Sequence, residues 1–344
     1  MTAAERLPID VAALLKAGWG LHTDAVHPVH TRWFTGKVLI RCDTPEVSWC
    51  LAGGPAAYRS RVATAAGYQA WLMQVGCRVI PAIRAVLDGE LLREDGAHVW
   101  TLMRWMDGAP EHDQSRWTGA MLEQLGRAVG QIHRLGRQVL TVGAAPQLVP
   151  DQFWAADWHG FDEWARARWE LLLDDTEVSG AAQLEPLRDA IRFGFEALPA
   201  LGTPRVRNLT VAHDDLWTEH VLFTPEGRLS AIIDLDGLDA GDGHGDFAAL
   251  ISDFANLDQG LCDHVVRGYR SECEVSAGDL VAARATAIRH HLLTLIERIR
   301  LWQERPERRE DLISPLGYWL RSIRAAVELD PDRWAAAILE AARA

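Results

Sequence analysis

The spacing of apolar residues changes once along the chain, close to residue 107, and this change limits the fold more than any other feature. Before it, β-branched and aromatic residues gather in short segments separated by turn signals such as Thr35-Gly36 and Asp43-Thr44-Pro45. Between Val26 and Leu51 these segments read HTRWF, KVLIRC and EVSWCLA. The pattern predicts an antiparallel meander of strands.

The rest of the first hundred residues is expected to add a helix and two strands. The helix, a strand with its loop, and an alternating strand are predicted over residues 56–75, 81–92 and 98–105. After Pro110 the apolar residues recur at helical spacing, at Leu122, Leu125, Val129, Ile132 and Leu135. We therefore expect an α+β fold with two lobes. The first is a small antiparallel β-sheet lobe with one helix over residues 1–106, and the second is a larger, mainly α-helical lobe over residues 107–344.

Composition narrows the class of protein. The 344 residues are 48% hydrophobic and include no apolar run of the ~18 residues that a membrane span needs. The N-terminus lacks a basic start followed by an apolar stretch, and the five cysteines follow no disulfide or zinc spacing. We expect a soluble cytoplasmic protein with buried thiols, without a membrane partner, that is a monomer or a homodimer. The net charge of −13 opposes binding to nucleic acid; it either favours cationic small molecules or only keeps the protein soluble.

Polar residues cluster between two short β-like runs, Val206–Ala212 and Ala231–Leu235. The segment VAHDDLWTEHVLF, residues 211–223, holds His213, Asp215 and His220, and the later run IIDLD holds Asp234. Two such clusters at the ends of adjacent strands can converge on one metal ion and one hydroxyl group. Phosphoryl transfer needs that arrangement, because the protein mainly positions groups and neutralises charge.

These motifs resemble the aminoglycoside phosphotransferase and choline kinase family, which has a protein-kinase-like fold. In that family a catalytic loop HGDxxxxN or HNDxxxxH is followed by IDxxD and then GDxxxD. The matching residues here are His213-Asp214-Asp215 with His220, Ile233-Asp234, and Gly241-Asp242 with Asp246. The resemblance covers residues 211–250 and extends more loosely to LGRAVGQIHRLG and to TLMRWMDG, the strand that leads to the hinge.

The resemblance implies a role for each matching residue. Asp215 is expected to orient the accepting hydroxyl, with His213 bracing the loop and Asp246 tying its backbone to the next helix. His220 and Asp234 are expected to hold Mg²⁺ on the phosphates of ATP or GTP. Because His220 replaces the usual asparagine, the site would also accept Mn²⁺. Nucleotide contacts are implied at Met103 and Trp105.

The first lobe departs from the family at the lysine that contacts the phosphates. Kinase-like folds carry this lysine on the third strand, where the present chain reads Trp49-Cys-Leu-Ala52. The chain has only two lysines, Lys16 and Lys37. Either an arginine makes the contact, with Arg41, Arg59 and Arg61 as the candidates, or nucleotide binding differs from the family pattern.

The acceptor is expected to bind through carboxylates that lie beside aromatic rings, an arrangement suited to a polyamine or guanidinium group. The candidate substrate residues are Asp157, Trp158, Asp162, Glu163 and Asp236. The tryptophans near helical spacing have an alternative interpretation as core residues.

We therefore predict a phosphotransferase that acts on a hydroxyl of a small, cationic antibiotic or metabolite, with a possible role in antibiotic resistance. A catalytically silent, kinase-like binding protein is the main alternative, since the lysine is missing. A metal-dependent hydrolase that uses His213, Asp215 and His220 is a third possibility. The pair His290-His291 lies within a helical stripe and is interpreted as packing.

Overall fold

The computed structural model describes residues 9–29, 37–113, 116–141, 158–175, 178, 180–201, 209–241, 243–306, 309–310 and 316–343. The chain divides into two compact units, and neither is one continuous stretch of sequence. The first comprises Met1–His112, Gln138–Leu148 and Glu219–Asp239, and the second comprises Asp113–Arg137, Val149–Thr218 and Ala240–Ala344. The division at residue 106 that we expected remains a prediction.

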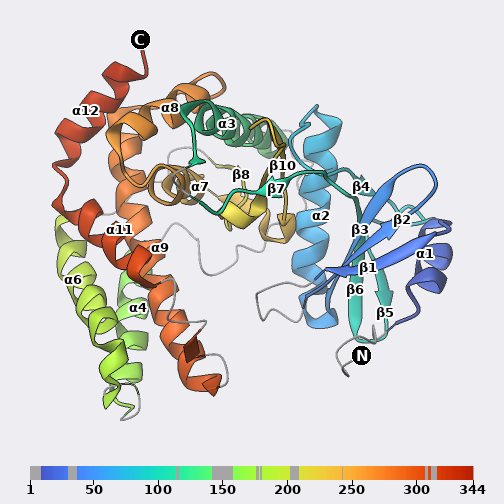
Figure 1. The fold of residues 1–344 in the computed structure, drawn as a ribbon, viewed down its shortest axis with the longest axis horizontal. Helices are drawn as coiled ribbons and strands as arrows, with labels where there is room; N and C mark the ends of the chain where they lie inside the picture. Colours follow the sequence, from blue (N-terminus) through green and yellow to red (C-terminus); the bar gives the residue numbers. More distant parts are fainter. Residues whose placement is uncertain are drawn as a thin grey trace. The chain divides into compact units, whose positions relative to one another are not determined.

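An antiparallel sheet forms the centre of the first unit (Figure 1). Its strands are β1 (Ala25–Val29), β2 (Val38–Asp43), β3 (Ser48–Pro55), β6 (His98–Arg104) and β4 (Ile83–Arg84), in that spatial order, with β5 (Arg93–Asp95) also paired to β6. This confirms the predicted meander, although HTRWF lies outside the described residues and β1 precedes it. The predicted strand with its loop over 81–92 contains the two-residue β4, and the loop after it turns at Gly89, where φ is +95°.

Side chains alternate between the two faces of this sheet. Ile40, Leu51 and Leu102 point to one face, where they form a buried core with α1 (Val11–Trp19). Asp10 begins α1, since its side chain accepts a hydrogen bond from the backbone N–H of Ala13 at 3.0 Å. The opposite face turns toward α2 (Arg59–Gln74), the predicted helix of this lobe, so the sheet lies between the two helices (Figure 1).

A second, smaller sheet of the first unit joins residues far apart in sequence. It consists of β7 (Ala109–Pro110), β9 (Val221–Phe223) and β10 (Leu229–Ile232), in the order β10-β9-β7. The backbone N–H of Ile232 donates to the carbonyl of Val79 at 2.7 Å. These bonds bring the segment that follows β10 to the α2 side of the large sheet.

Helices make up most of the second unit, as predicted. They are α3 (Gly119–Thr141), α4 (Trp158–Leu173), α6 (Glu185–Leu201), α7 (His244–Ala249), α8 (Gln259–Arg270), α9 (Ala277–Glu304), α11 (Leu316–Glu328) and α12 (Pro331–Ala341). The long helix α9 packs against α4, α6, α7, α11 and α12 and is the axis of the unit (Figure 1). The short strands β8 (Thr210–Ala212) and β11 (Asp239–Gly241) pair with each other.

Helices α3 and α8 approach so closely that glycine is required on both. A Cβ atom added to Gly126 would lie 2.2 Å from the carbonyl oxygen of Val265, and one added to Gly268 would lie 2.0 Å from that of Glu123. This crossing fixes α3, which carries His133.

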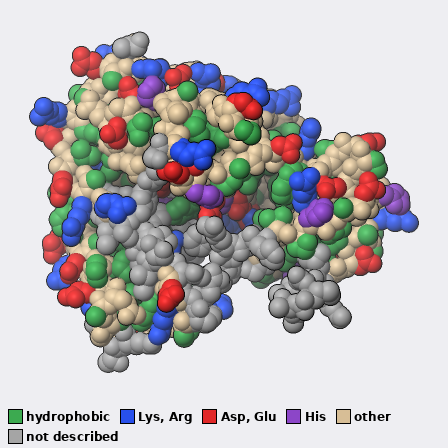
Figure 2. All heavy atoms as spheres, in the orientation of Figure 1, with side chains coloured by type: hydrophobic (Ala, Val, Ile, Leu, Met, Phe, Trp, Pro, Cys, Tyr) green, Lys and Arg blue, Asp and Glu red, His purple; other side chains and the backbone are tan. Residues whose placement is uncertain are grey.

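The surface of the described residues mixes charges of both signs. On the face shown in Figure 2, acidic and basic side chains are interspersed, despite the net charge of −13. None of the described helices is long and apolar enough to cross a membrane.

Candidate active site

A cavity of about 310 Å³ lies within the first unit, between the large sheet and α2. Its walls are mainly apolar and come from the sheet face opposite α1, from α2 and from the segment after β10, and include Leu39, Cys50, Ala52, Ala65, Ala66, Thr101, Met103 and Trp105. Lys37, Asp234 and Asp236 give it one charged region. The volume and the mixture of apolar walls with few convergent polar groups are typical of a small-molecule site.

Lys37 immediately precedes β2, and its ammonium group contacts both carboxylates of this charged region. Its Nζ bonds to Oδ1 of Asp234 and lies 3.0 Å from Oδ2 of Asp236, and its side chain is 16% exposed. Burial by itself lowers the pKa of Lys37, but the charges of Asp234 and Asp236 outweigh it and hold that pKa above its ordinary value. Lys37 is therefore a buried cation that stays charged.

Asp234 also faces His220, the other predicted metal ligand. Nε2 of His220 lies 3.2 Å from Oδ2 of Asp234, and the carbonyl of His220 accepts a hydrogen bond from the N–H of Ile233 at 2.8 Å. Burial acts to raise the pKa of Asp234, but the hydrogen bond from His220 and the charge of Lys37 hold it well below its ordinary range. Asp234 is thus an ionised carboxylate beside an imidazole. A carboxylate must be ionised to bind a metal ion.

Two residues supply this donor set, and the described residues include no group of three or more histidine, cysteine or acidic ligands. Mg²⁺ is commonly held by only one or two protein ligands together with substrate phosphates. The carboxylate of Asp234 fits such a site, whereas the imidazole of His220 is a softer ligand than the oxygens that Mg²⁺ prefers.

The residues predicted to contact the nucleotide differ in whether they line the cavity. Met103 and Trp105 line the cavity. Arg41 binds Asp43 at 2.8 Å and lies over the ring of Trp105, and Arg59 binds Glu94. Arg61 donates to the carbonyl of Asp236 at 3.3 Å. None of these three described arginines lines the cavity, whereas Lys37 does. We missed Lys37 because the family carries its lysine on the next strand.

The predicted catalytic loop lies in the second unit, directly after β8. Asp214 has φ +59°, the left-handed region that asparagine, aspartate and glycine tolerate best. The N–H of Asp215 donates to Nδ1 of His213 at 3.3 Å, and the indole N–H of Trp217 donates to Oδ1 of Asp215 at 2.6 Å. His213 thus contacts the backbone of this loop, and its bracing role stays a prediction. The motif did not reveal the contact of Trp217 with Asp215.

Asp246 holds the backbone of this loop through hydrogen bonds, as we expected. Its two carboxylate oxygens accept the backbone N–H groups of His213 at 2.7 Å and Asp214 at 2.9 Å. His133 of α3 bridges Asp246 at 2.9 Å and the hydroxyl of Tyr269 at 2.7 Å. Burial acts to raise the pKa of Asp246, but its hydrogen bond and charge interaction with His133 hold it below the ordinary value. The only sequence signal for His133 was the run IHRLG in the weaker part of the resemblance.

The predicted substrate residues are only partly described. Asp157 lies outside the described residues, as does the side chain of Trp158, which begins α4. Both carboxylate oxygens of Asp162 accept hydrogen bonds from Arg289 at 2.8 Å, and this arginine is 1% exposed. Glu163 is exposed on α4. Asp162 therefore joins α4 to α9, and its role in substrate binding stays a prediction.

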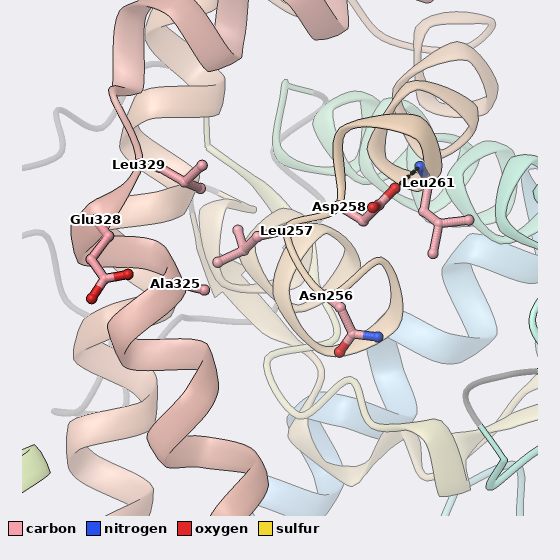
Figure 3. A pocket seen from close by; sticks show the side chains of 7 residues that line it. All are labelled: Asn256, Leu257, Asp258, Leu261, Ala325, Glu328 and Leu329. Carbon is pink, nitrogen blue, oxygen red and sulfur yellow. Dashed lines mark hydrogen bonds between the residues drawn. The ribbon is translucent and has the colours of Figure 1, made fainter.

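A second hollow occurs in the second unit, at the turn before α8 and the end of α11 (Figure 3). Asn256 and Leu257 in this turn have φ values of +52° and +57°. Of its two carboxylates, that of Asp258 accepts from the N–H of Leu261 at 3.0 Å, as Figure 3 shows, and so begins α8. The hollow offers no counterpart of the charged region around Lys37.

Comparisons with known proteins agree with the motifs. A family model described as the phosphotransferase enzyme family matches residues 49–280, more than half of the chain. No curated protein matches the sequence. Among solved structures, spectinomycin phosphotransferase in complex with ADP and spectinomycin has a TM-score of 0.71 at 14% identity, over 94% of this chain and 100% of that chain.

Two further solved structures have the same fold. An aminoglycoside phosphotransferase from Alicyclobacillus acidocaldarius has a TM-score of 0.64 at 12% identity, over 99% of each chain. A microcompartment-associated aminopropanol kinase has a TM-score of 0.60 at 19% identity, over 92% of this chain and 95% of that chain. The fold is thus the kinase-like fold of small-molecule phosphotransferases. The chain belongs to the phosphotransferase enzyme family, which confirms the predicted family, fold class and enzyme class.

Proposed function

We propose that the protein transfers the γ-phosphoryl group of a nucleoside triphosphate, ATP or GTP, to a hydroxyl group of a small molecule. The hydroxyl oxygen forms a bond to the γ-phosphorus while the bond from that phosphorus to the β–γ bridging oxygen breaks. The proton of the hydroxyl passes to the carboxylate of Asp215, and the nucleoside diphosphate leaves. His213 and Asp246 hold the loop that carries Asp215.

The observation that carries this proposal is the charged region of the cavity, where the ammonium of Lys37 bonds to Asp234 and lies 3.0 Å from Oδ2 of Asp236. A cavity with apolar walls suits a nucleobase, and Met103 and Trp105 lie in those walls. A cation with two carboxylates at one place suits phosphates bound with a divalent ion. Asp234 and His220 would hold Mg²⁺ or Mn²⁺, which neutralises charge on the phosphates when it is bound.

For the acceptor we propose a small cationic alcohol, such as an aminoglycoside-like antibiotic or an amino alcohol. The net charge of −13 favours a cationic ligand. Two solved structures with the same fold, a spectinomycin phosphotransferase and an aminopropanol kinase, support the same class of acceptor. A role in antibiotic resistance would follow if the acceptor is an antibiotic. We also propose a cytoplasmic location, in keeping with five cysteines that are in the thiol form.

The test is a screen for transfer of labelled γ-phosphate from ATP and from GTP to a panel of aminoglycosides, peptide antibiotics and amino alcohols. Asp215→Asn should lower turnover of any positive acceptor by about a hundredfold or more, while nucleotide affinity stays within a few-fold. An Asn variant as active as the parent contradicts the role of Asp215. Nucleotide binding without transfer to any acceptor would favour the silent binding protein instead.

A further inference from the structure

We propose that Lys37, immediately before β2, makes the phosphate contact for which this chain has no lysine on β3. The inference rests on the proposed function, since it concerns the same nucleotide. It gives the role to a residue outside the family motif.

The pairing of the strands shows how a lysine on β2 can reach the position that β3 leaves without a cation. Leu39 of β2 pairs with Ala52 of β3, and both line the cavity. Because side chains alternate along a strand, Lys37 points to the same face as Leu39, two residues away. From β3 the cavity receives only the side chains of Cys50 and Ala52, and neither is charged.

Lys37 is also held where an anion would bind. Its long side chain is mostly buried and directed at Asp234 and Asp236. The local sum of one ammonium and two carboxylates is negative, so a divalent ion with a phosphate could join the group without leaving the lysine unpaired. An ammonium with three donors can contact a carboxylate and a phosphate oxygen together.

One other cation belongs to the cavity lining, and it lies at the opposite end of the sheet. Arg104 pairs with Trp49, whereas the Lys37 end of β2 pairs with Gly53, a separation of about 13 Å along the strand. Arg41, Arg59 and Arg61, the candidates from the sequence, bind Asp43, Glu94 and a backbone carbonyl. Of these cations, Lys37 is the one whose side chain contacts the carboxylate of Asp234.

The experiment compares binding of the triphosphate with binding of its bare nucleoside by titration calorimetry, for the parent and for Lys37→Gln. Triphosphate affinity should fall about ten- to a hundredfold in Lys37→Gln, while nucleoside affinity stays within about twofold, because only the phosphates interact with the charge. Lys16→Gln is the matched control: it removes the other lysine, which is exposed on α1, and should bind both ligands like the parent.

Removing Lys37 leaves two carboxylates facing each other, so the same substitution is also made in an Asp236→Asn background and compared with that background alone. The selective loss of triphosphate affinity should recur there. Equal loss of nucleoside and triphosphate in both backgrounds would indicate a structural role and overturn the proposal. The proposal would also be overturned if Lys37→Gln bound the triphosphate with the affinity of the parent. It would likewise be overturned if the selective loss of triphosphate affinity occurred in Arg41→Gln, Arg59→Gln or Arg61→Gln instead. If the parent itself binds no triphosphate with Mg²⁺, the proposed function fails as well.

Discussion

The indole N–H of Trp217 donates a hydrogen bond of 2.6 Å to Oδ1 of Asp215. The ring of His290 lies beside the indole, with ring centroids 5.8 Å apart. A tryptophan nitrogen is only a donor, so Oδ1 of Asp215 is the acceptor, and the indole restrains the position of this oxygen. Trp217 is therefore a positioning residue for the proposed base.

Trp217→Phe keeps an aromatic ring and removes the donor. We expect kcat to fall about ten- to a hundredfold, the range for losing a hydrogen bond to a charged group, and KM for the nucleotide to stay within about twofold. Trp164→Phe, at a partly exposed position of α4, is the control and should leave kcat and KM unchanged. Unchanged kcat in Trp217→Phe would show that the indole does not position Asp215.

Asp234→Ala removes the proposed metal ligand that lies 3.2 Å from His220. Nucleotide binding should lose its dependence on Mg²⁺, and turnover should be abolished with it. The measurement is a thermal shift with the triphosphate across a Mg²⁺ titration. Asp95→Ala, at an exposed carboxylate of the same unit, should keep the dependence. Turnover that still depends on Mg²⁺ in Asp234→Ala would reject the ligand role.

Asp246→Asn replaces one of the two acceptor oxygens that hold the loop with an NH₂ group. Because Asp246 is 1% exposed, one backbone N–H is left without an acceptor, and we expect a loss of roughly 1–3 kcal/mol in the free energy of unfolding. Urea denaturation measures it. Asp330→Asn, at the residue that begins α12, should be nearly neutral because asparagine caps helices as well as aspartate does.

Stability should fall as the pH drops below about 6.5 because of His291, which is completely buried. Burial, with the charge of His290 as a second cause, lowers the pKa of His291 well below 6.5. As the pH falls, the unfolded chain therefore takes up a proton at this histidine before the folded chain does. Below about pH 6.5 the free energy of unfolding then falls by up to about 1.4 kcal/mol per pH unit. His291→Gln should flatten this slope in urea denaturation, and His22→Gln, at an exposed histidine, should not. Equal slopes in all three proteins would contradict the prediction.

Local patterns predicted the local parts of the fold. Helix α2, strands β2, β3 and β6 and helix α3 follow from residue spacing within each segment. The membership of Glu219–Asp239 in the first unit could not be predicted in the same way. It depends on hydrogen bonds such as that from Ile232 to Val79, between residues that no short window contains together.

The candidate site shows the same limit. The motif positioned Asp215, His220 and Asp234 in the chain, but long-range contacts decide what surrounds them. Arg289 and Asp162 are 127 residues apart and form a pair that no spacing rule reveals. Lys37 lies 197 residues from Asp234, so only the folded chain shows that they meet.

The left-handed backbone at Asp214 has a consequence for how such a loop can change by mutation. The φ of +59° restricts this position mainly to glycine, asparagine and aspartate. In the genetic code, asparagine (AAC) and glycine (GGC) differ by two bases, and aspartate (GAC) is one base from each. A gene can therefore pass from the HND form of the loop to the HGD form through HDD, the form present in this chain, without leaving the residues that the backbone allows.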